Sequence, residues 1–254
     1  MKFLRLSLIV LVPLAITASM IFVLQYPSFY FQAVVASFVL QDIMLFFLFP
    51  RQERKWDVVS ITFPIVFHML LAWAVLFYVE DIHFLYTVAI AQCILQYIFL
   101  GNVYYFLYKF DRYQKRALPH ITSYTGIVNV FYATVLVYAL SFYQDIPIWY
   151  SIGPLLLFLF LTIIQNMWIH DVSLRRRWYY VVVALTVMTQ LIFATQILPS
   201  VYFVNALWLV LCYYMTVHLG IAALQKELTR KEMIRNGVII AVVVLLVLIT
   251  TRWR

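Results

Sequence analysis

Charged side chains are scarce in this sequence. Only 18 of its 254 residues are Lys or Arg and 10 are Asp or Glu, which together make up 11% of the chain. A soluble domain of this length has roughly a quarter of its residues charged, because its surface must face water. Since 66% of the residues are hydrophobic and no long polar stretch separates the apolar runs, the sequence excludes a soluble domain and indicates an integral membrane protein.

The sequence also lacks the motifs of several enzyme classes. It contains no Walker loop, GxGxxG, HExxH, GxSxG or paired acidic motif, so phosphoryl transfer and metalloproteolysis are not expected. No Lys lies in the middle of an apolar run, which excludes a retinal-type Schiff base. Both cysteines, Cys93 and Cys212, lie inside apolar runs and do not indicate a disulfide framework. We assign no catalytic residue, no metal site and no cofactor.

Nine apolar runs approach the length of about 20 residues that crosses a hydrocarbon layer. They lie near residues 6–24, 29–49, 58–79, 84–108, 121–143, 149–168, 178–197, 201–224 and 237–251. They do not alternate polar with apolar residues, as the strands of a membrane barrel do. Backbone groups in lipid must form hydrogen bonds within their own segment, so the runs are predicted to be helices. The predicted fold is an all-α polytopic membrane protein: a single bundle over residues 1–254, with nine spans arranged as successive hairpins.

Two of the runs permit a different assignment. The ninth is short for a full crossing and ends in Arg252-Trp253-Arg254; as a tilted or re-entrant tail it would leave eight spans. The first follows Lys2 and Arg5 and ends near small residues, so a cleaved signal peptide is its alternative. We expect both runs to be transmembrane helices.

The basic residues predict the orientation of the chain. Besides Lys2, Arg5 and the terminal Arg252 and Arg254, they cluster in alternate connections, within residues 51–55, 109–116, 175–177 and 226–235. The intervening connections, around residues 26–28, 80–83, 144–147 and 199–200, contain no Lys or Arg. Because short basic loops stay in the cytoplasm, we expect a multi-pass cell-membrane protein with a cytoplasmic amino terminus, and the very short loops favour a bacterial inner membrane. The net charge of +8 then indicates contact with the bilayer and its anionic headgroups, not with nucleic acid.

A weak internal repeat appears when positions are counted from three basic loops. His68, Asn129 and Gln190 each lie 13 positions after the last basic residue of a loop, and each is followed four positions later by alanine. Residues four apart share a helix face, so these polar residues are predicted to lie at one depth in three spans. Duplication is one explanation; equal loop and span lengths are the other.

A second group of polar residues is predicted nearer the cytoplasm. It contains Asp42, Asn166 and His218, together with Asn102. An ionisable side chain that faces lipid is costly, so such residues usually face the interior of a bundle and are candidates for function. We therefore predict a ligand- or proton-binding site formed by Asp42, His68, Asn129, Asn166, Gln190 and His218. The alternative is that these groups only join helices through hydrogen bonds.

Aromatic and basic residues near the span ends suggest two further sites. Aromatic residues make up 19% of the chain and gather at positions such as 29–31 and 77–78. An interfacial aromatic belt explains them; the alternative is a pocket for a polyisoprenoid or another flat apolar ligand. Arg175, Arg176 and Arg177 are predicted to meet lipid headgroups, because Arg binds phosphate bidentately.

Three functions are compatible with these observations. The first is a small transporter or intramembrane ligand-binding protein built around the polar cluster. The second is a scaffold, a sensor input or an accessory subunit of a larger membrane complex, with another membrane protein or a second copy as the partner. The third is a lipid-modifying enzyme that holds an apolar chain among its helices and a phosphate on its arginines.

Overall fold

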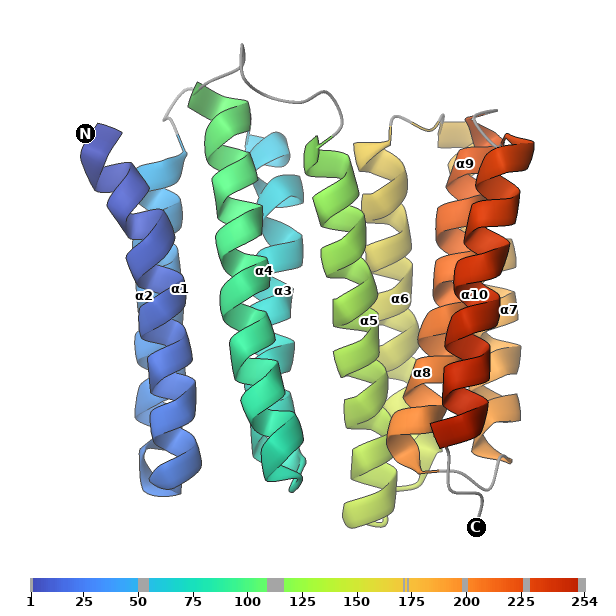
Figure 1. Ribbon diagram of the computed structural model, residues 1–254, viewed down its shortest axis with the longest axis horizontal. Helices are drawn as coiled ribbons and strands as arrows, with labels where there is room; N and C mark the ends of the chain where they lie inside the picture. Colours follow the sequence, from blue (N-terminus) through green and yellow to red (C-terminus); the bar gives the residue numbers. More distant parts are fainter. Residues whose placement is uncertain are drawn as a thin grey trace. The chain divides into compact units, whose positions relative to one another are not determined.

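The computed structural model describes residues 2–49, 55–108, 117–170, 172, 174–197, 201–225 and 229–250. These residues are almost entirely helical, and no strand occurs among them. The elements in chain order are α1 (Lys2–Gln25), the 3-10 turn η1 (Pro27–Phe29), α2 (Tyr30–Leu48), α3 (Lys55–Tyr78), α4 (Ile82–Tyr108), α5 (Ala117–Tyr143), α6 (Ile148–Ile169), α7 (Leu174–Gln196), α8 (Tyr202–Tyr213), the π-helix η3 (Tyr214–Leu219), α9 (Gly220–Leu224) and α10 (Arg230–Thr250) (Figure 1).

The predicted all-α polytopic membrane fold is confirmed, and the number of full-length spans in the described part of the chain is eight. These spans coincide with the first eight predicted runs. The ninth run lies in α10, within which the shorter apolar helix Met233–Leu245 is described. The sequence stays apolar from Leu245 to the last residue of α10, Thr250, so a ninth full crossing stays a prediction.

The described chain divides into two compact units, residues 1–129 and 130–254, which share the continuous helix α5. In the first unit, α1 packs against both α2 and α4, and α3 packs against α4. Small hydroxyl side chains let these helices approach closely: Thr17 of α1 donates to the carbonyl of Ala89 at 3.3 Å, and the Ser19 and Ser37 hydroxyls lie 3.1 Å apart.

Side chains from other helices cap the last turn of α2. The final carbonyls of a helix have no donor within it and must find one elsewhere. Arg5 Nε donates to Phe47 O at 3.0 Å, and Tyr108 Oη donates to Leu48 O at 2.6 Å. The Arg5 guanidinium also lies 4.2 Å from the centre of the Tyr108 ring. Three helices are thus joined at the end of the unit where the chain begins.

Two aspartates shape turns at the opposite ends of the helices. Asp81 is the N-cap of α4, because its carboxylate accepts from the backbone N–H groups of His83 and Phe84 at 3.0 and 3.1 Å. Asp145 has a φ of 52° in the connection before α6. Aspartate tolerates this left-handed conformation better than most residues, so Asp145 can close the short turn between α5 and α6.

In the second unit, α7 packs against both α6 and α8. After α8 the helix widens into η3 and then returns to α-geometry at Gly220. Gly220 lies against the ring of Tyr180 in α7, and a Cβ at this position would overlap the Tyr180 hydroxyl. The contact of the Tyr180 ring with the backbone at position 220 therefore requires glycine here.

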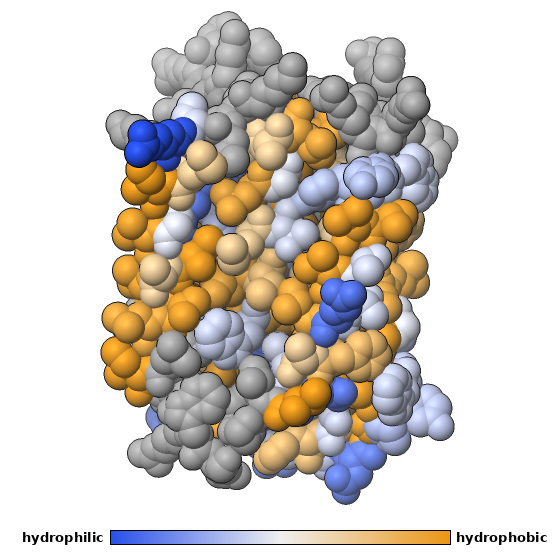
Figure 2. Space-filling model, turned by 90° about the vertical axis from the view of Figure 1, so that its right-hand side faces the viewer, coloured by the Kyte–Doolittle hydropathy of each residue, from blue (hydrophilic) through white to orange (hydrophobic). Residues whose placement is uncertain are grey.

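The face on the side of α7 and α10 is mostly hydrophobic, with few hydrophilic residues across its middle (Figure 2). Large apolar side chains are exposed along both helices, among them Val182 and Val183 of α7 and Val242 and Leu245 of α10. An outward apolar surface of this kind is what a lipid-facing helix presents.

Replacing Gly220 by Ala is expected to lower the free energy of unfolding by about 1–3 kcal/mol, because the half-buried Tyr180 ring must shift from its packed position. The measurement is equilibrium unfolding in mixed detergent micelles. Gly101→Ala and Gly153→Ala are matched controls, since a Cβ at either position meets no atom within 4 Å. A Gly220→Ala variant as stable as these controls would contradict the proposed close packing.

Candidate functional site

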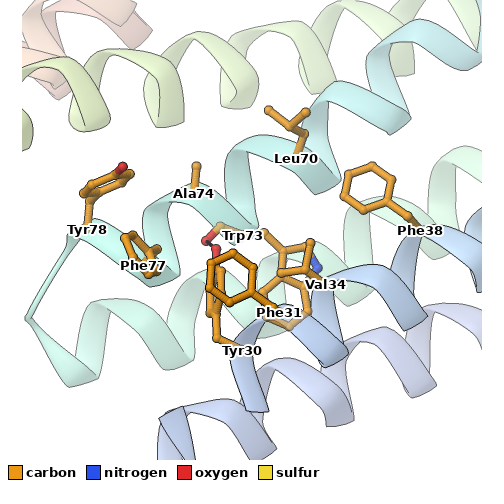
Figure 3. Close-up of a pocket in the computed structure, with 9 residues that line it drawn as sticks. All are labelled: Tyr30, Phe31, Val34, Phe38, Leu70, Trp73, Ala74, Phe77 and Tyr78. Atoms are coloured by element: carbon orange, nitrogen blue, oxygen red, sulfur yellow. Dashed lines mark hydrogen bonds between the residues drawn. The ribbon is translucent and has the colours of Figure 1, made fainter. Parts of the chain in front are cut away.

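A groove of about 450 Å³ lies along one side of the first unit, between α2 and α3 (Figure 3). It is lined by Tyr30, Phe31, Val34 and Phe38 of α2 and by Leu70, Trp73, Ala74, Phe77 and Tyr78 of α3. The lining positions recur every three or four residues on each helix, so each helix presents one face to the groove. The volume is within the range of about 300–1,000 Å³ typical of small-molecule sites.

Aromatic contacts hold the floor of this groove in place. The Tyr30 and Trp73 rings meet edge to face, with centroids 5.6 Å apart at 86°, and the Tyr30 ring lies 4.9 Å from that of Phe77. Tyr30 Oη donates to the backbone carbonyl of Trp73 at 2.7 Å, which joins the first turn of α2 to α3. Pairs of this geometry are favourable beyond their buried area, so the wall is preformed.

The groove is open on its outer side. Phe31 is 73% exposed and Phe77 is 53% exposed, whereas Trp73 behind them is only 2% exposed. The groove runs from Tyr30 and Tyr78, at the ends of their helices, to Phe38, two turns deeper in α2. Eight residues of helix extend about 12 Å. The lining therefore offers a long apolar surface with phenol groups at the mouth.

His68 and Asn129, two of the predicted site residues, form a hydrogen-bonded pair in the core of the first unit. Asn129 Nδ2 donates to the carbonyl of Pro64 at 2.9 Å, which orients the amide because a carbonyl can only accept. Asn129 Oδ1 then faces His68 Nδ1 at 2.8 Å, so this ring nitrogen carries the proton and donates. His68 is fully buried and Asn129 is 2% exposed. The pair joins α3 to the first half of α5.

The second unit contains two further predicted residues, at separate contacts. Asn166 of α6 is 2% exposed and donates through Nδ2 to Tyr213 Oη at 3.2 Å. His218 lies in the π-helix and stacks on the ring of Tyr214, with centroids 5.0 Å apart and an interplanar angle of 15°. Tyr214 in turn donates to Asn236 Oδ1 at 3.0 Å. These residues connect α6, η3 and α10 to their neighbours.

The remaining two candidates do not point into a bundle, and the expectation that they face the interior is wrong. Asp42 is exposed on α2 and Gln190 is exposed on α7. The alanines that follow His68, Asn129 and Gln190 by four positions differ in burial in the same way as these polar residues. Ala72 and Ala133 are buried, whereas Ala194 is exposed. Equal spacing from a basic loop sets depth along a helix, but the rotation of each helix decides which face is covered.

The predicted headgroup site falls partly outside the described residues. Arg175, Arg176 and Arg177 are in the first turn of α7, and the positions of their side chains are among those left undescribed. The prediction that they contact lipid phosphate stays a prediction. No cluster of three or more His, Cys, Asp or Glu side chains that could hold a metal occurs in the described part of the chain.

A chain of three buried glutamines was missed by sequence reasoning. Gln92 Nε2 donates to Gln96 Oε1 at 3.3 Å, and Gln96 Nε2 donates to Gln41 Oε1, linking α4 to α2. All three side chains are fully buried. The available signal was the pair Gln92 and Gln96, one turn apart in an otherwise apolar run. Titratable residues received more weight, although an uncharged amide is cheaper to bury than a carboxylate.

Comparison of the chain with protein-family models, with curated proteins and with solved structures finds no match. Its function is therefore argued from the geometry of the groove and of the polar contacts.

The His68–Asn129 contact is expected to stabilise the first unit measurably. Asn129→Leu should lower the free energy of unfolding by about 1–3 kcal/mol, since it removes two hydrogen bonds from a buried site. In a double-mutant cycle with His68→Leu, we expect a coupling free energy between positions 68 and 129 of about 0.6–1.7 kcal/mol, the size found for hydrogen bonds between membrane helices.

Asn102→Leu is the matched control for this cycle. Among the described residues, Asn102 Nδ2 donates to Ile98 O within its own helix α4, at 2.8 Å, and to no other helix, so its replacement should change the free energy of unfolding by less than about 0.5 kcal/mol. A coupling near zero between positions 68 and 129 would contradict a structural role for this pair.

Proposed function

We propose that this multi-pass membrane protein is an intramembrane ligand-binding protein that holds the apolar chain of a lipid in the groove between α2 and α3. The observation that carries the proposal is the groove itself: a preformed, aromatic-lined trough about 450 Å³ in volume on the outer face of a membrane helix pair. Acyl and isoprenoid chains share the chemistry that fits it, namely a long, flexible and apolar shape.

The composition of the groove lining favours an acyl or isoprenoid chain as the ligand over a polar solute. Seven of the nine lining residues, including Phe31, Phe38 and Phe77, present only carbon atoms or a largely buried indole to the groove. Polar oxygens lie at one end, on Tyr30 and Tyr78. Tyrosines prefer the boundary between hydrocarbon and headgroups. A lipid would thus place its chain along the trough and its more polar end near the phenols.

The arrangement of the polar candidates gives less support to transport through a polar cavity. Asp42 and Gln190 face outward, while Asn166 and Asn129 are engaged in contacts between helices. Such contacts are the ordinary means by which polar residues join membrane helices. The proposal therefore keeps the ligand-binding half of the first predicted function and moves the site from the polar cluster to the aromatic groove.

The proposal is tested by photo-crosslinking in proteoliposomes. The probes are a phosphatidylcholine with a diazirine on its acyl chain and a diazirine-bearing polyisoprenol. We expect labelled peptides within residues 30–38 and 70–78, found by mass spectrometry. Competition with unlabelled phosphatidylcholine or unlabelled polyisoprenol then shows which of the two lipids the groove prefers, because only the preferred lipid displaces the labelled probe at low excess.

Ala74→Phe fills the groove without leaving a cavity and should lower this labelling about tenfold. Excluding two methylene groups from contact costs about 1.6 kcal/mol, slightly more than the 1.4 kcal/mol that corresponds to a tenfold loss of affinity. Ala194→Phe is the matched control, since Ala194 is exposed on α7 and distant in sequence from the groove. Equal labelling of the two variants and the unaltered protein would overturn the proposal.

A further inference from the structure

Asp42 has an unusual position for an ionisable residue of a membrane helix. It lies on the exposed face of α2, while the preceding residue, Gln41, is fully buried against α4. No hydrogen bond or ion pair of Asp42 occurs among the described residues. Carboxylates within membrane segments almost always face protein or water, because a charge in hydrocarbon is costly. The physical expectation is that another protein surface covers this side of α2.

The residues around Asp42 form an otherwise apolar stripe. Val35, Val39 and Phe46 are 62%, 51% and 66% exposed, and together with Asp42 they recur at intervals of three or four residues. Such spacing places them on one face of the helix. The stripe therefore has the features of a helix-packing surface with one acidic group about 9 Å, or six residues, from the end of α2 at Leu48.

Arg235 of α10 has matching properties. It is exposed, and it lies five residues, or about 7.5 Å, from the start of α10 at Arg230. Eight spans precede α10, so the start of α10 lies on the same side of the membrane as the end of α2. Counted from the apolar ends at Leu48 and Met233, Asp42 lies six residues deep and Arg235 two. The long flexible side chain of Arg can reach across this difference of about 6 Å. Arg5, the other described cation in a span, is already engaged with Phe47 and Tyr108.

The face of α10 around Arg235 is also apolar and uncovered. Ile234, Val238 and Val242 are 59%, 57% and 50% exposed, and they follow the spacing of one helix face. In its own unit α10 is held by Asn236, which accepts from Tyr214 on the opposite side of the helix. The exposed stripes of α2 and α10 are therefore both apolar, and Asp42 and Arg235 give them charges of opposite sign.

We propose that α10 of a second copy of this chain packs on the exposed face of α2, with an ion pair between Asp42 of one copy and Arg235 of the other. This contact would neutralise the carboxylate in the membrane and give α10 a protein neighbour on its apolar side. It goes beyond lipid binding in the α2–α3 groove, which it adjoins because the groove residue Phe38 lies one helical turn before Asp42 on α2.

The contact is tested with single cysteines in separate chains, on a background of Cys93→Ala and Cys212→Ala. Asp42→Cys in a chain with one affinity tag and Arg235→Cys in a chain with another are co-expressed in full length and oxidised in the membrane. We expect a disulfide-linked dimer that carries both tags. Ile98→Cys, an exposed position on α4, replaces Asp42→Cys as the matched control and should give at least tenfold less of that dimer. Equal cross-linking of the two pairs would overturn the proposal.

A second measurement avoids engineered cysteines. The self-association of the full chain in lipid is followed by energy transfer between two labelled populations. Asp42→Asn and Arg235→Gln, which remove the charge but keep a polar side chain, should each reduce association about tenfold, because each leaves the other charge without its partner. The exchanged pair Asp42→Arg with Arg235→Asp should restore it. Unchanged association in both neutral variants would overturn the proposal, regardless of whether lipid probes label the α2–α3 groove in the photo-crosslinking experiment.

Discussion

The need of buried polar groups for hydrogen-bond partners within the protein shapes this structure. In hydrocarbon there is no water to satisfy an amide, a hydroxyl or a carbonyl, so the backbone is helical and polar side chains connect neighbouring helices. The bond from Asn129 to Pro64 and the bond between Asn166 and Tyr213 are examples in the two units. The same need makes the outward carboxylate of Asp42 informative, since no hydrogen bond or ion pair of this side chain occurs among the described residues.

These polar contacts and the proposed site have different locations in the first unit. The glutamine chain and the His68–Asn129 pair hold the core, whereas the groove is made by aromatic side chains toward the ends of α2 and α3. Along this wall, the hydrogen bond from Tyr30 to Trp73 and the contact between their rings join α2 to α3. Binding would then need little reorganisation of the protein, which favours affinity.

Sequence reasoning succeeded for the membrane helices and only partly for the site. Eight of the predicted runs are long apolar helices, because about 20 apolar residues have few alternatives in a bilayer. The residues His68, Asn129 and Gln190 have equal spacing from their basic loops, yet the first two meet in the core and the third faces outward. Aromatic residues at 30–31 and 77–78 were read mainly as an interfacial belt, and the structure places four of them around one groove.

By itself the sequence determined the class of protein, its helices and the depth of each polar residue, since these follow from composition and from the rise of a helix along the chain. Only the tertiary structure decided which side of each helix is covered. A rotation of about 100° separates Gln41, which is buried in the glutamine chain, from Asp42, which is exposed. Nothing in the local sequence encodes that rotation, because it depends on the packing of α2 against α1 and α4.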